Sequence, residues 1–215
     1  GYTSRKTMML AQQLYEGVEL GGLGRQGLIT YMRTDSTRIS ELAQNEAKAF
    51  LTETLGAEYV PAKPNIYAAG KKAQDAHEAI RPTSIANTPE AVEPFLTKEQ
   101  AKLYRLIWQR FAASQMTPAV YDTMSVTIDA GARCQLKSSG SRLKFAGFTA
   151  VYAGADATKK EKDVVLPELA AGDTLTLESV DPQQHFTEPP PRYNDASLVK
   201  TLEEKEIGRP STYAP

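Results

Sequence analysis

The stretch GLITYMRTDS, residues 27–36, places a phenol, a guanidinium and a carboxylate close together in the chain. In an extended segment residues two apart share a face, so Arg33 is expected beside Tyr31, with Asp35 placed to orient Arg33. A tyrosine phenol has a pKa of about 10, so it attacks a phosphodiester only when its proton is removed and the resulting charge is balanced. These residues therefore predict Tyr31 as a nucleophile, with Arg33 holding the non-bridging oxygens of the phosphate under attack.

The same stretch has a simpler explanation, a strand with one buried tyrosine and an ion pair at the surface. Tyrosine is commonly a half-buried packing residue, and the chain has 10 of them. One short motif does not decide between a nucleophile and a packing residue. The choice depends on the other motifs that the chain carries.

A second motif, QDAHEAIRPT at residues 74–83, brings His77, Glu78 and Arg81 together in a segment that we expect to be a loop. It combines proton carriers with a cation suited to phosphate. Taken alone, His77 is more often a structural histidine, and no second histidine or cysteine has the spacing of a zinc site. The other histidine, His185, is expected to be structural.

A third motif, IGRPSTY at residues 207–213, follows the last predicted helix. A plain helix end with a turn explains Gly208 and Pro210. It does not explain Arg209 with two hydroxyls, Ser211 and Thr212, whose donors are suited to a backbone phosphate.

Composition bounds the class of protein. The chain has 215 residues, 41% of them hydrophobic, which is enough for a core in one or two domains. It has no apolar run of about 18 residues and no signal-peptide pattern, and its single cysteine excludes an internal disulfide framework. We therefore expect a cytoplasmic protein. The net charge of −1 does not itself predict a nucleic-acid partner, so that prediction rests on the local motifs.

Helical periodicity predicts a first helix that begins at Ser4, its expected N-cap, and ends at the glycine-rich residues 17–27. A short apolar segment, residues 28–32, follows and places the tyrosine near the end of an element. A second helix is expected over residues 41–55, with Ser40 as its N-cap.

The strongest helix signal is a capping box of Thr97 with Gln100, followed by a stripe that we expect in the core: Leu103, Ile107 and Phe111. A last helix is expected after a proline-rich linker. Its cap lies near Asn194 to Ser197, and Gly208 marks its end.

After Pro118 the period changes from helical to alternating, with apolar residues at every second position: Met124, Val126 and Ile128. Residues 142–152 and 173–180 are also β-like, and the charged residues 158–163 are expected to be a solvated loop tip. The pattern of helices followed by strands predicts an α+β fold.

The three motifs, in this order and at these separations, closely resemble the type IA DNA topoisomerases, and within them the bacterial topoisomerase I family. The resemblance covers nearly the whole chain, although residues 17–26 look longer than the link before the tyrosine in many relatives. It implies an α+β multidomain fragment: a helical domain with the active-site tyrosine (residues 1–117), β-strands of the topoisomerase arch (residues 118–187), and a linker with the first helix of a further DNA-binding domain (residues 188–215).

By this resemblance, Tyr31 matches the nucleophile that cuts one DNA strand, giving a 5′-phosphotyrosine and a free 3′-hydroxyl. The enzyme passes the other strand through the gap, reseals the cut, and so relaxes negatively supercoiled DNA. Arg33 matches the arginine that binds the scissile phosphate. Supporting or DNA-contacting positions are matched by Gln12, Glu16, Thr30, Thr34, Asp35, His77, Glu78, Arg81, Gly208, Arg209, Ser211 and Thr212.

The family places Mg²⁺ on acidic residues of an amino-terminal Toprim domain, and no Asp-x-Asp-x-Glu run occurs in this chain. We therefore expect a fragment that lacks the metal site, binds no cofactor of its own and is inactive alone. The expected partners are single-stranded and negatively supercoiled DNA, with no membrane. We expect a monomer in the bacterial cytoplasm, associated with the nucleoid.

Three other interpretations are weighed against this one. Relatives of the topoisomerase III kind tend to have proline after the tyrosine and a second histidine after the first, where this chain has Met32 and Glu78. A module that binds single-stranded DNA without cutting it would form no covalent adduct. A helical scaffold with a packed Tyr31 would have no affinity for single-stranded DNA, and three coincident motifs argue against it.

Overall fold

The computed structural model describes residues 2–67, 77–131, 134–152, 166–208 and 212. Its α-helices are α1 (Ser4–Glu16), α2 (Glu41–Leu55), α3 (Pro89–Val92), α4 (Lys98–Ser114) and α5 (Asp195–Glu204). Its strands are β1 (Val18–Glu19), β2 (Arg25–Gln26), β3 (Val120–Asp129) and β4 (Gln135–Phe145). Short 3-10 helices are η1 (Gly21–Leu23), η2 (Ala57–Tyr59), η3 (Glu93–Phe95) and η4 (Gly147–Tyr152). The predicted α+β class is confirmed.

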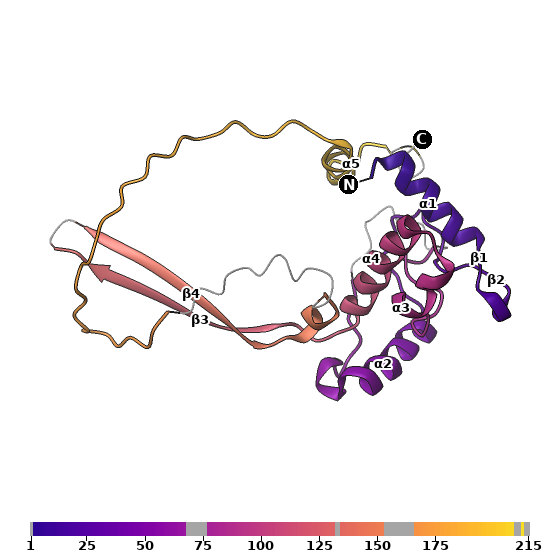
Figure 1. Ribbon diagram of the computed structural model, residues 1–215, viewed down its shortest axis with the longest axis horizontal. Coiled ribbons are helices and arrows are strands. Elements are labelled where there is room, and N and C mark those ends of the chain that lie inside the picture. Colours follow the sequence, from indigo (N-terminus) through magenta and orange to yellow (C-terminus); the bar gives the residue numbers. More distant parts are fainter. Residues whose placement is uncertain (1, 68–76, 132–133, 153–165, 209–211, 213–215) are drawn as a thin grey trace.

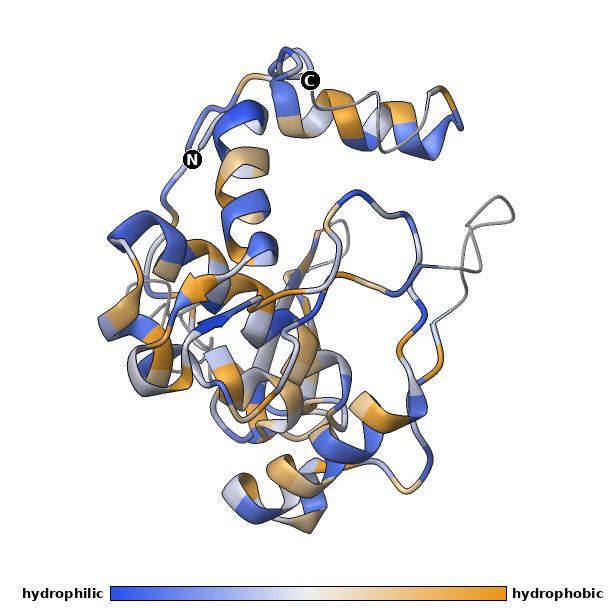
Figure 2. Cartoon of the chain, turned by 90° about the vertical axis from the view of Figure 1, so that its right-hand side faces the viewer, coloured by the Kyte–Doolittle hydropathy of each residue, from blue (hydrophilic) through white to orange (hydrophobic). Residues whose placement is uncertain are grey.

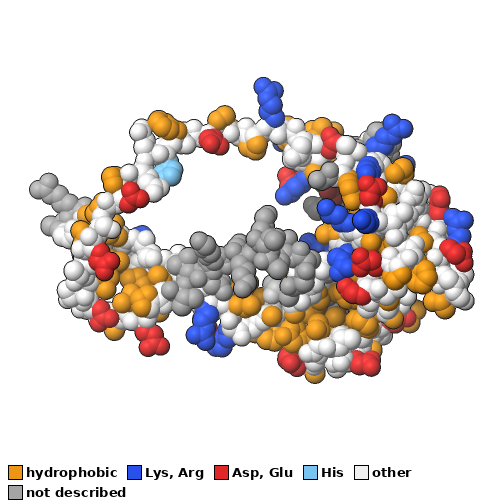
Figure 3. All heavy atoms as spheres, in the orientation of Figure 1, with side chains coloured by type: hydrophobic (Ala, Val, Ile, Leu, Met, Phe, Trp, Pro, Cys, Tyr) orange, Lys and Arg blue, Asp and Glu red, His pale blue; other side chains and the backbone are white. Residues whose placement is uncertain are grey.

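The described chain follows an open ring (Figure 1). Helices α1 to α4 form one helical unit, β3 and β4 extend from it as a long ribbon, and an extended segment leads back to α5. There the backbone N–H and hydroxyl of Ser4 donate to Asp195 Oδ2 at 3.4 and 3.3 Å, which brings the start of α5 to the start of α1. The opening remains when all atoms are drawn (Figure 3). None of the helices in the described residues is long and apolar enough to cross a membrane.

The helices begin where side chains satisfy their first free N–H groups. The capping box of Thr97 with Gln100 is present, and a second one joins Asn194 to Ser197. The prediction for α1 is wrong by one residue, because Thr3 is the N-cap and its hydroxyl accepts from the Lys6 N–H. Ser40 caps α2 as predicted.

The core lies where α1, α2 and α4 meet, and the helices show alternating hydrophobic and hydrophilic bands (Figure 2). The predicted stripe on α4 is partly wrong: Phe111 is buried, but Leu103 and Ile107 only flank the core. Its centre is instead Tyr104 and Trp108, because both aromatic rings bury while their polar tips find carbonyls.

The polar group of each of these two rings donates one hydrogen bond to a backbone carbonyl in the segment before α4. The Tyr104 hydroxyl donates to Asn87 O at 2.6 Å, and Trp108 Nε1 donates to Ile85 O at 2.9 Å. Burial raises the pKa of the Tyr104 phenol above its ordinary range, so this phenol keeps the proton that it donates to Asn87 O even at a pH at which an exposed tyrosine ionises. Aromatic residues whose polar groups are hydrogen-bonded can therefore fill the core in place of the expected Leu103 and Ile107.

The alternation after Pro118 is confirmed by β3, which pairs antiparallel with β4. The β-like interpretation of residues 142–152 holds only to Phe145. Gly147, at φ +49°, then starts η4, and a Cβ on it would lie 2.3 Å from Pro118 O, so the chain turns there. Residues 173–180 were also predicted as strand, but they are exposed and take no strand conformation. Residues 158–163 lie outside the described residues.

The segment that carries the tyrosine, residues 27–36, is fixed against the end of α1. The Leu28 N–H donates to Leu14 O at 2.8 Å. Gly27 approaches the helix so closely that a Cβ built on it would lie 2.6 Å from Tyr15 O, a backbone atom that cannot move without the helix. Only glycine fits this approach, so Gly27 fixes the start of the tyrosine segment against the end of α1.

We therefore predict that Gly27→Ala lowers the free energy of unfolding of this chain by roughly 1–3 kcal/mol, the usual cost of overpacking. The control is Gly22→Ala, because a Cβ at Gly22 meets nothing within 4 Å. Its effect should stay within about 0.5 kcal/mol. Denaturant unfolding followed by circular dichroism measures both, and equal effects of the two exchanges would contradict the close approach.

Candidate active site

The tyrosine segment (residues 27–36) pairs with the histidine segment (residues 77–83) through backbone hydrogen bonds. The Thr30 N–H donates to Arg81 O at 2.9 Å, and the Thr83 N–H donates to Leu28 O at 3.0 Å. Between them, Ile29 and Pro82 form an isolated antiparallel bridge. The two motifs, about fifty residues apart in sequence, are therefore neighbours in space, although neither forms a regular strand.

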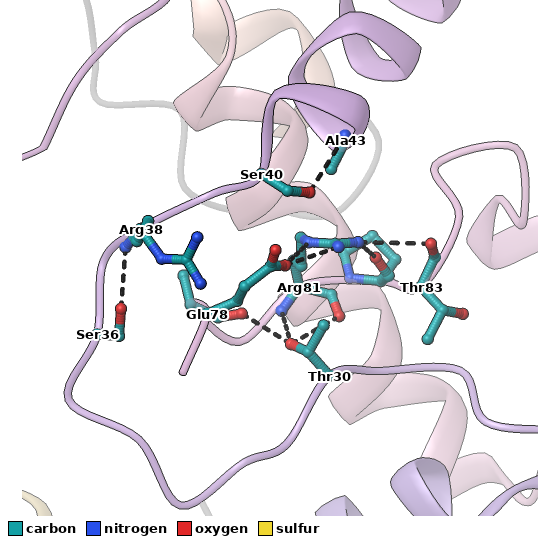
Figure 4. Close-up of polar contacts among 10 residues, drawn as sticks. Thr30, Ser36, Arg38, Ser40, Ala43, Glu78, Arg81 and Thr83 are labelled. Carbon is teal, nitrogen blue, oxygen red and sulfur yellow. Dashed lines mark hydrogen bonds and ion pairs between the residues drawn. The ribbon is translucent and has the colours of Figure 1, made fainter. Parts of the chain in front are cut away.

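The Thr30 side chain adds a further link between the two segments (Figure 4). Its hydroxyl donates to Ala79 O at 2.7 Å and accepts from the Arg81 N–H at 2.9 Å. One side chain thus uses both its donor and its acceptor capacity across the pair. Thr30, predicted as a supporting residue, fixes the backbone one position before the tyrosine.

Tyr31 projects from this paired backbone and is 39% exposed. Its neighbours Met32 and Ile29 are buried, so the backbone on both sides is anchored in the core. The Tyr31 ring contacts two other rings, each with centroids 5.5 Å away: Tyr15 of α1, T-shaped at 66°, and His77, tilted at 55°. The resemblance implied a supporting or DNA-contacting role for His77, whereas Tyr15 was not among the predicted residues.

Arg33 is exposed, as is Tyr31, and the buried Met32 lies between them. This alternation is the one expected for residues two apart in an extended chain. The expected orientation of Arg33 by Asp35 is not found, since no ion pair or hydrogen bond joins them in the described part of the chain. The chain bends at residues 32–33, so it is not extended from Tyr31 to Asp35 as the expectation requires.

Hydroxyls hold the chain after this bend. The Ser36 N–H donates to Thr34 Oγ1 at 3.0 Å, and the Arg38 N–H donates to Ser36 Oγ at 3.2 Å. The Arg38 carbonyl in turn accepts from the Ala79 N–H at 2.8 Å. Thr34 therefore shapes the loop that follows the tyrosine. The bond between Arg38 and Ala79 ties this loop to the histidine segment.

Glu78 and Arg81, both predicted to contact nucleic acid, form an ion pair with each other at 2.7 Å, and their side chains are 21% and 13% exposed. Arg81 NH1 also donates to Pro82 O at 2.9 Å (Figure 4). In this arrangement the guanidinium is turned toward the protein. Its bonds to Glu78, Pro82 and Thr83 all lie within the histidine segment, and they hold that segment in shape.

Gln12 and Glu16 lie one helical turn apart on α1, and Gln12 Nε2 donates to Glu16 Oε1 at 2.5 Å. Tyr15, which contacts the Tyr31 ring, belongs to the same last turn of this helix. The end of α1 thus borders the tyrosine. Glu16 is exposed and Gln12 is half-buried.

The third motif is described only in part. Gly208 is exposed with φ +83°, and Thr212 is exposed. Arg209 and Ser211 lie outside the described residues. The motif follows α5, whose start reaches α1 through the contact of Asp195 with Ser4.

Charge and metal chemistry follow from the side chains around the site. Several Lys and Arg side chains, mixed with acidic ones, line the opening on the side of the helical unit (Figure 3). Among the described residues, no group of three or more His, Cys, Asp or Glu side chains could hold a metal ion. The described residues therefore do not fit a Mg²⁺ site.

Of the two rings that contact Tyr31, His77 was among the residues predicted from sequence and Tyr15 was not. A tyrosine in the last turn of an amphipathic helix has no distinctive pattern. The available signal was its position between Gln12 and Glu16, both predicted to face the site.

Comparison with known proteins shows the family of the chain. The sequence model of a family described as DNA topoisomerase matches residues 1–215. The structure of full-length topoisomerase I from Thermotoga maritima, in a monoclinic crystal form, is similar with a TM-score of 0.80 and 41% sequence identity. The match covers 100% of this chain and 33% of that chain, so the chain spans about a third of the length of this relative. The chain belongs to the DNA topoisomerase family.

Proposed function

We propose that this chain is the strand-cleaving part of a type IA DNA topoisomerase of the bacterial topoisomerase I kind, with Tyr31 as its nucleophile. The observation that carries the proposal is the presentation of Tyr31. Its phenol is exposed, its backbone is fixed between two segments, and the exposed Arg33 follows two residues later. A tyrosine needed only for packing would not require this arrangement.

In the proposed reaction, the Tyr31 phenol oxygen attacks a phosphorus atom of one DNA strand. A bond forms between this oxygen and phosphorus, the bond from phosphorus to the 3′ oxygen breaks, and the 3′ oxygen leaves with a proton as a free hydroxyl. The strand stays attached to the protein through a 5′-phosphotyrosine. Attack by the 3′-hydroxyl reverses the step after the other strand has passed, so negatively supercoiled DNA is relaxed.

Arg33 is proposed to bind the non-bridging oxygens of the scissile phosphate, where a planar guanidinium can form two parallel hydrogen bonds. His77 is proposed to lie beside the cleaved strand, which its contact with the Tyr31 ring supports. The remaining predicted residues are proposed to shape the site or contact DNA: Gln12, Glu16, Thr30, Thr34, Asp35, Glu78, Arg81, Gly208, Arg209, Ser211 and Thr212.

The division of the chain is also part of the proposal. Residues 1–117 would form the tyrosine domain, residues 118–187 part of the arch, and residues 188–215 the linker and first helix of a further DNA-binding domain. The ribbon of β3 and β4 and the separate helix α5 support these limits. The parent enzyme would be a monomer in the bacterial cytoplasm, and its Mg²⁺ would be held by residues outside this chain.

The first prediction concerns Tyr31→Phe in the intact parent enzyme. The exchange keeps the ring contacts and removes one hydroxyl, so the free energy of unfolding should change by at most about 0.5–1.5 kcal/mol. The covalent adduct should disappear, because no oxygen remains to bond to phosphorus. Single-stranded DNA labelled at its 3′ end, incubated with Mg²⁺ and enzyme and then denatured, shows the adduct as label attached to protein, because the protein keeps the fragment on the 3′ side of the cut.

Its control is Tyr121→Phe, which removes a hydroxyl from a tyrosine of β3 that is 48% exposed. This variant should form the adduct as the parent does. An adduct that persists in Tyr31→Phe would assign the nucleophile to another residue.

The second prediction concerns Arg33→Lys, which keeps the charge but loses the two-pronged donor. Relaxation by the intact parent should fall roughly 10-fold or more, since one charged hydrogen bond contributes about 1.5–3 kcal/mol. The control is Arg25→Lys, at an exposed arginine of β2. Wild-type relaxation by Arg33→Lys would remove Arg33 from the phosphate site.

The third prediction is that this chain alone binds single-stranded DNA weakly and in a salt-dependent way. Each phosphate neutralised should contribute about −0.7 to the slope of log affinity against log salt. Titration of a labelled oligonucleotide at several salt concentrations gives this slope, and Arg33→Ala should make it shallower by about one contact. An affinity independent of salt would show that the chain makes no phosphate contacts.

A further inference from the structure

The Tyr31 ring contacts two other rings, which come from different elements. His77 belongs to the histidine segment, whereas Tyr15 belongs to the last turn of α1. Both ring centroids lie 5.5 Å from that of Tyr31. The phenol ring therefore contacts both elements that also hold its backbone.

The position of Tyr15 is itself fixed. Its carbonyl lies against Gly27, and the neighbouring Leu14 carbonyl accepts the Leu28 N–H at 2.8 Å. The small hairpin of β1 and β2 connects these two points, so the chain leaves α1, turns, and returns to the same helix end. Tyr15 and Tyr31 thus meet where the chain leaves the end of α1 and returns to it.

A ring at the surface needs such support. Tyr31 is 39% exposed and Tyr15 is 41% exposed, so neither is held by complete burial. Edge-to-face contact is a favoured geometry for aromatic pairs. Attack on phosphorus requires a particular direction of the phenol oxygen, and a small misplacement of reacting atoms lowers the rate strongly.

We propose that Tyr15 is a positioning residue, whose ring holds the Tyr31 phenol in the direction required for attack on the DNA phosphate. This inference rests on the proposed function of Tyr31. Tyr15 does not react itself, and its hydroxyl is not required. The Tyr15 ring contacts Tyr31 from α1, whereas the His77 ring contacts Tyr31 from the histidine segment.

The test compares Tyr15→Leu with Tyr15→Phe in the intact parent enzyme. Without the ring, the single-turnover rate of adduct formation should fall roughly 10-fold, which corresponds to about 1.4 kcal/mol. The dissociation constant for single-stranded DNA, measured without cleavage, should stay within about 2-fold, since Tyr15 binds no phosphate. Tyr15→Phe keeps the ring and should restore the rate of the parent.

A second measurement reports the ring contact without activity. Fluorotyrosine placed at position 31 of this chain gives a fluorine NMR signal that depends on the neighbouring rings. In the Tyr15→Leu background this signal should move toward that of free fluorotyrosine, whereas Tyr15→Phe should leave it near its original position. If Tyr15→Leu does not fold, Tyr15→Met is measured in the same two ways.

The outcomes separate the two proposals. Adduct formation by Tyr31→Phe would overturn the proposed function itself. If only Tyr31→Phe loses the adduct and Tyr15→Leu cleaves at the rate of the parent, Tyr15 has no positioning role. Equal loss by Tyr15→Leu and Tyr15→Phe would show that the hydroxyl matters, which also overturns the ring contact as the cause.

Discussion

The pairing of the tyrosine segment with the histidine segment is the constraint on which the site depends. Neither segment is a regular strand, so each would leave backbone groups without partners if it stood alone. Together they satisfy these groups through Thr30, Arg81 and the bridge of Ile29 with Pro82. Two motifs that are far apart in sequence are thus joined into one surface.

This pairing explains how one tyrosine is presented. The buried Leu28 and Ile29 anchor the segment, Gly27 fixes it against α1, and Thr30 ties it to the histidine segment. The next residue is Tyr31, whose phenol is exposed and contacts rings from both elements. The long ribbon of β3 and β4 and the helix α5 extend from this helical unit around an opening (Figure 1). The exposed Tyr31 belongs to the helical unit, which contains the hydrophobic core.

Much of this was predictable from sequence, because caps and alternation are local properties. The capping boxes and β3 are correct for that reason. One prediction failed where a distant contact decides the conformation, because Gly147 turns against Pro118 and ends the strand. Residues 173–180 have a strand-like pattern, but they are exposed and pair with no strand among the described residues. The expected pairing of Asp35 with Arg33 also fails, because it assumed an extended chain and the chain bends at residues 32–33. Tyr15 was missed because its meaning depends on a ring that only the folded chain brings to it.

The central claim is that the Tyr31 oxygen becomes bonded to DNA. The most direct test traps the adduct of the intact parent enzyme, digests it with nuclease and trypsin, and locates the remaining nucleotide by mass spectrometry. Trypsin cuts after Arg25 and Arg33, so the relevant peptide is residues 26–33, which contains a single tyrosine. The account predicts a 5′-linked nucleotide on Tyr31 in this peptide. A nucleotide on any other residue, with residues 26–33 recovered unmodified, would contradict it.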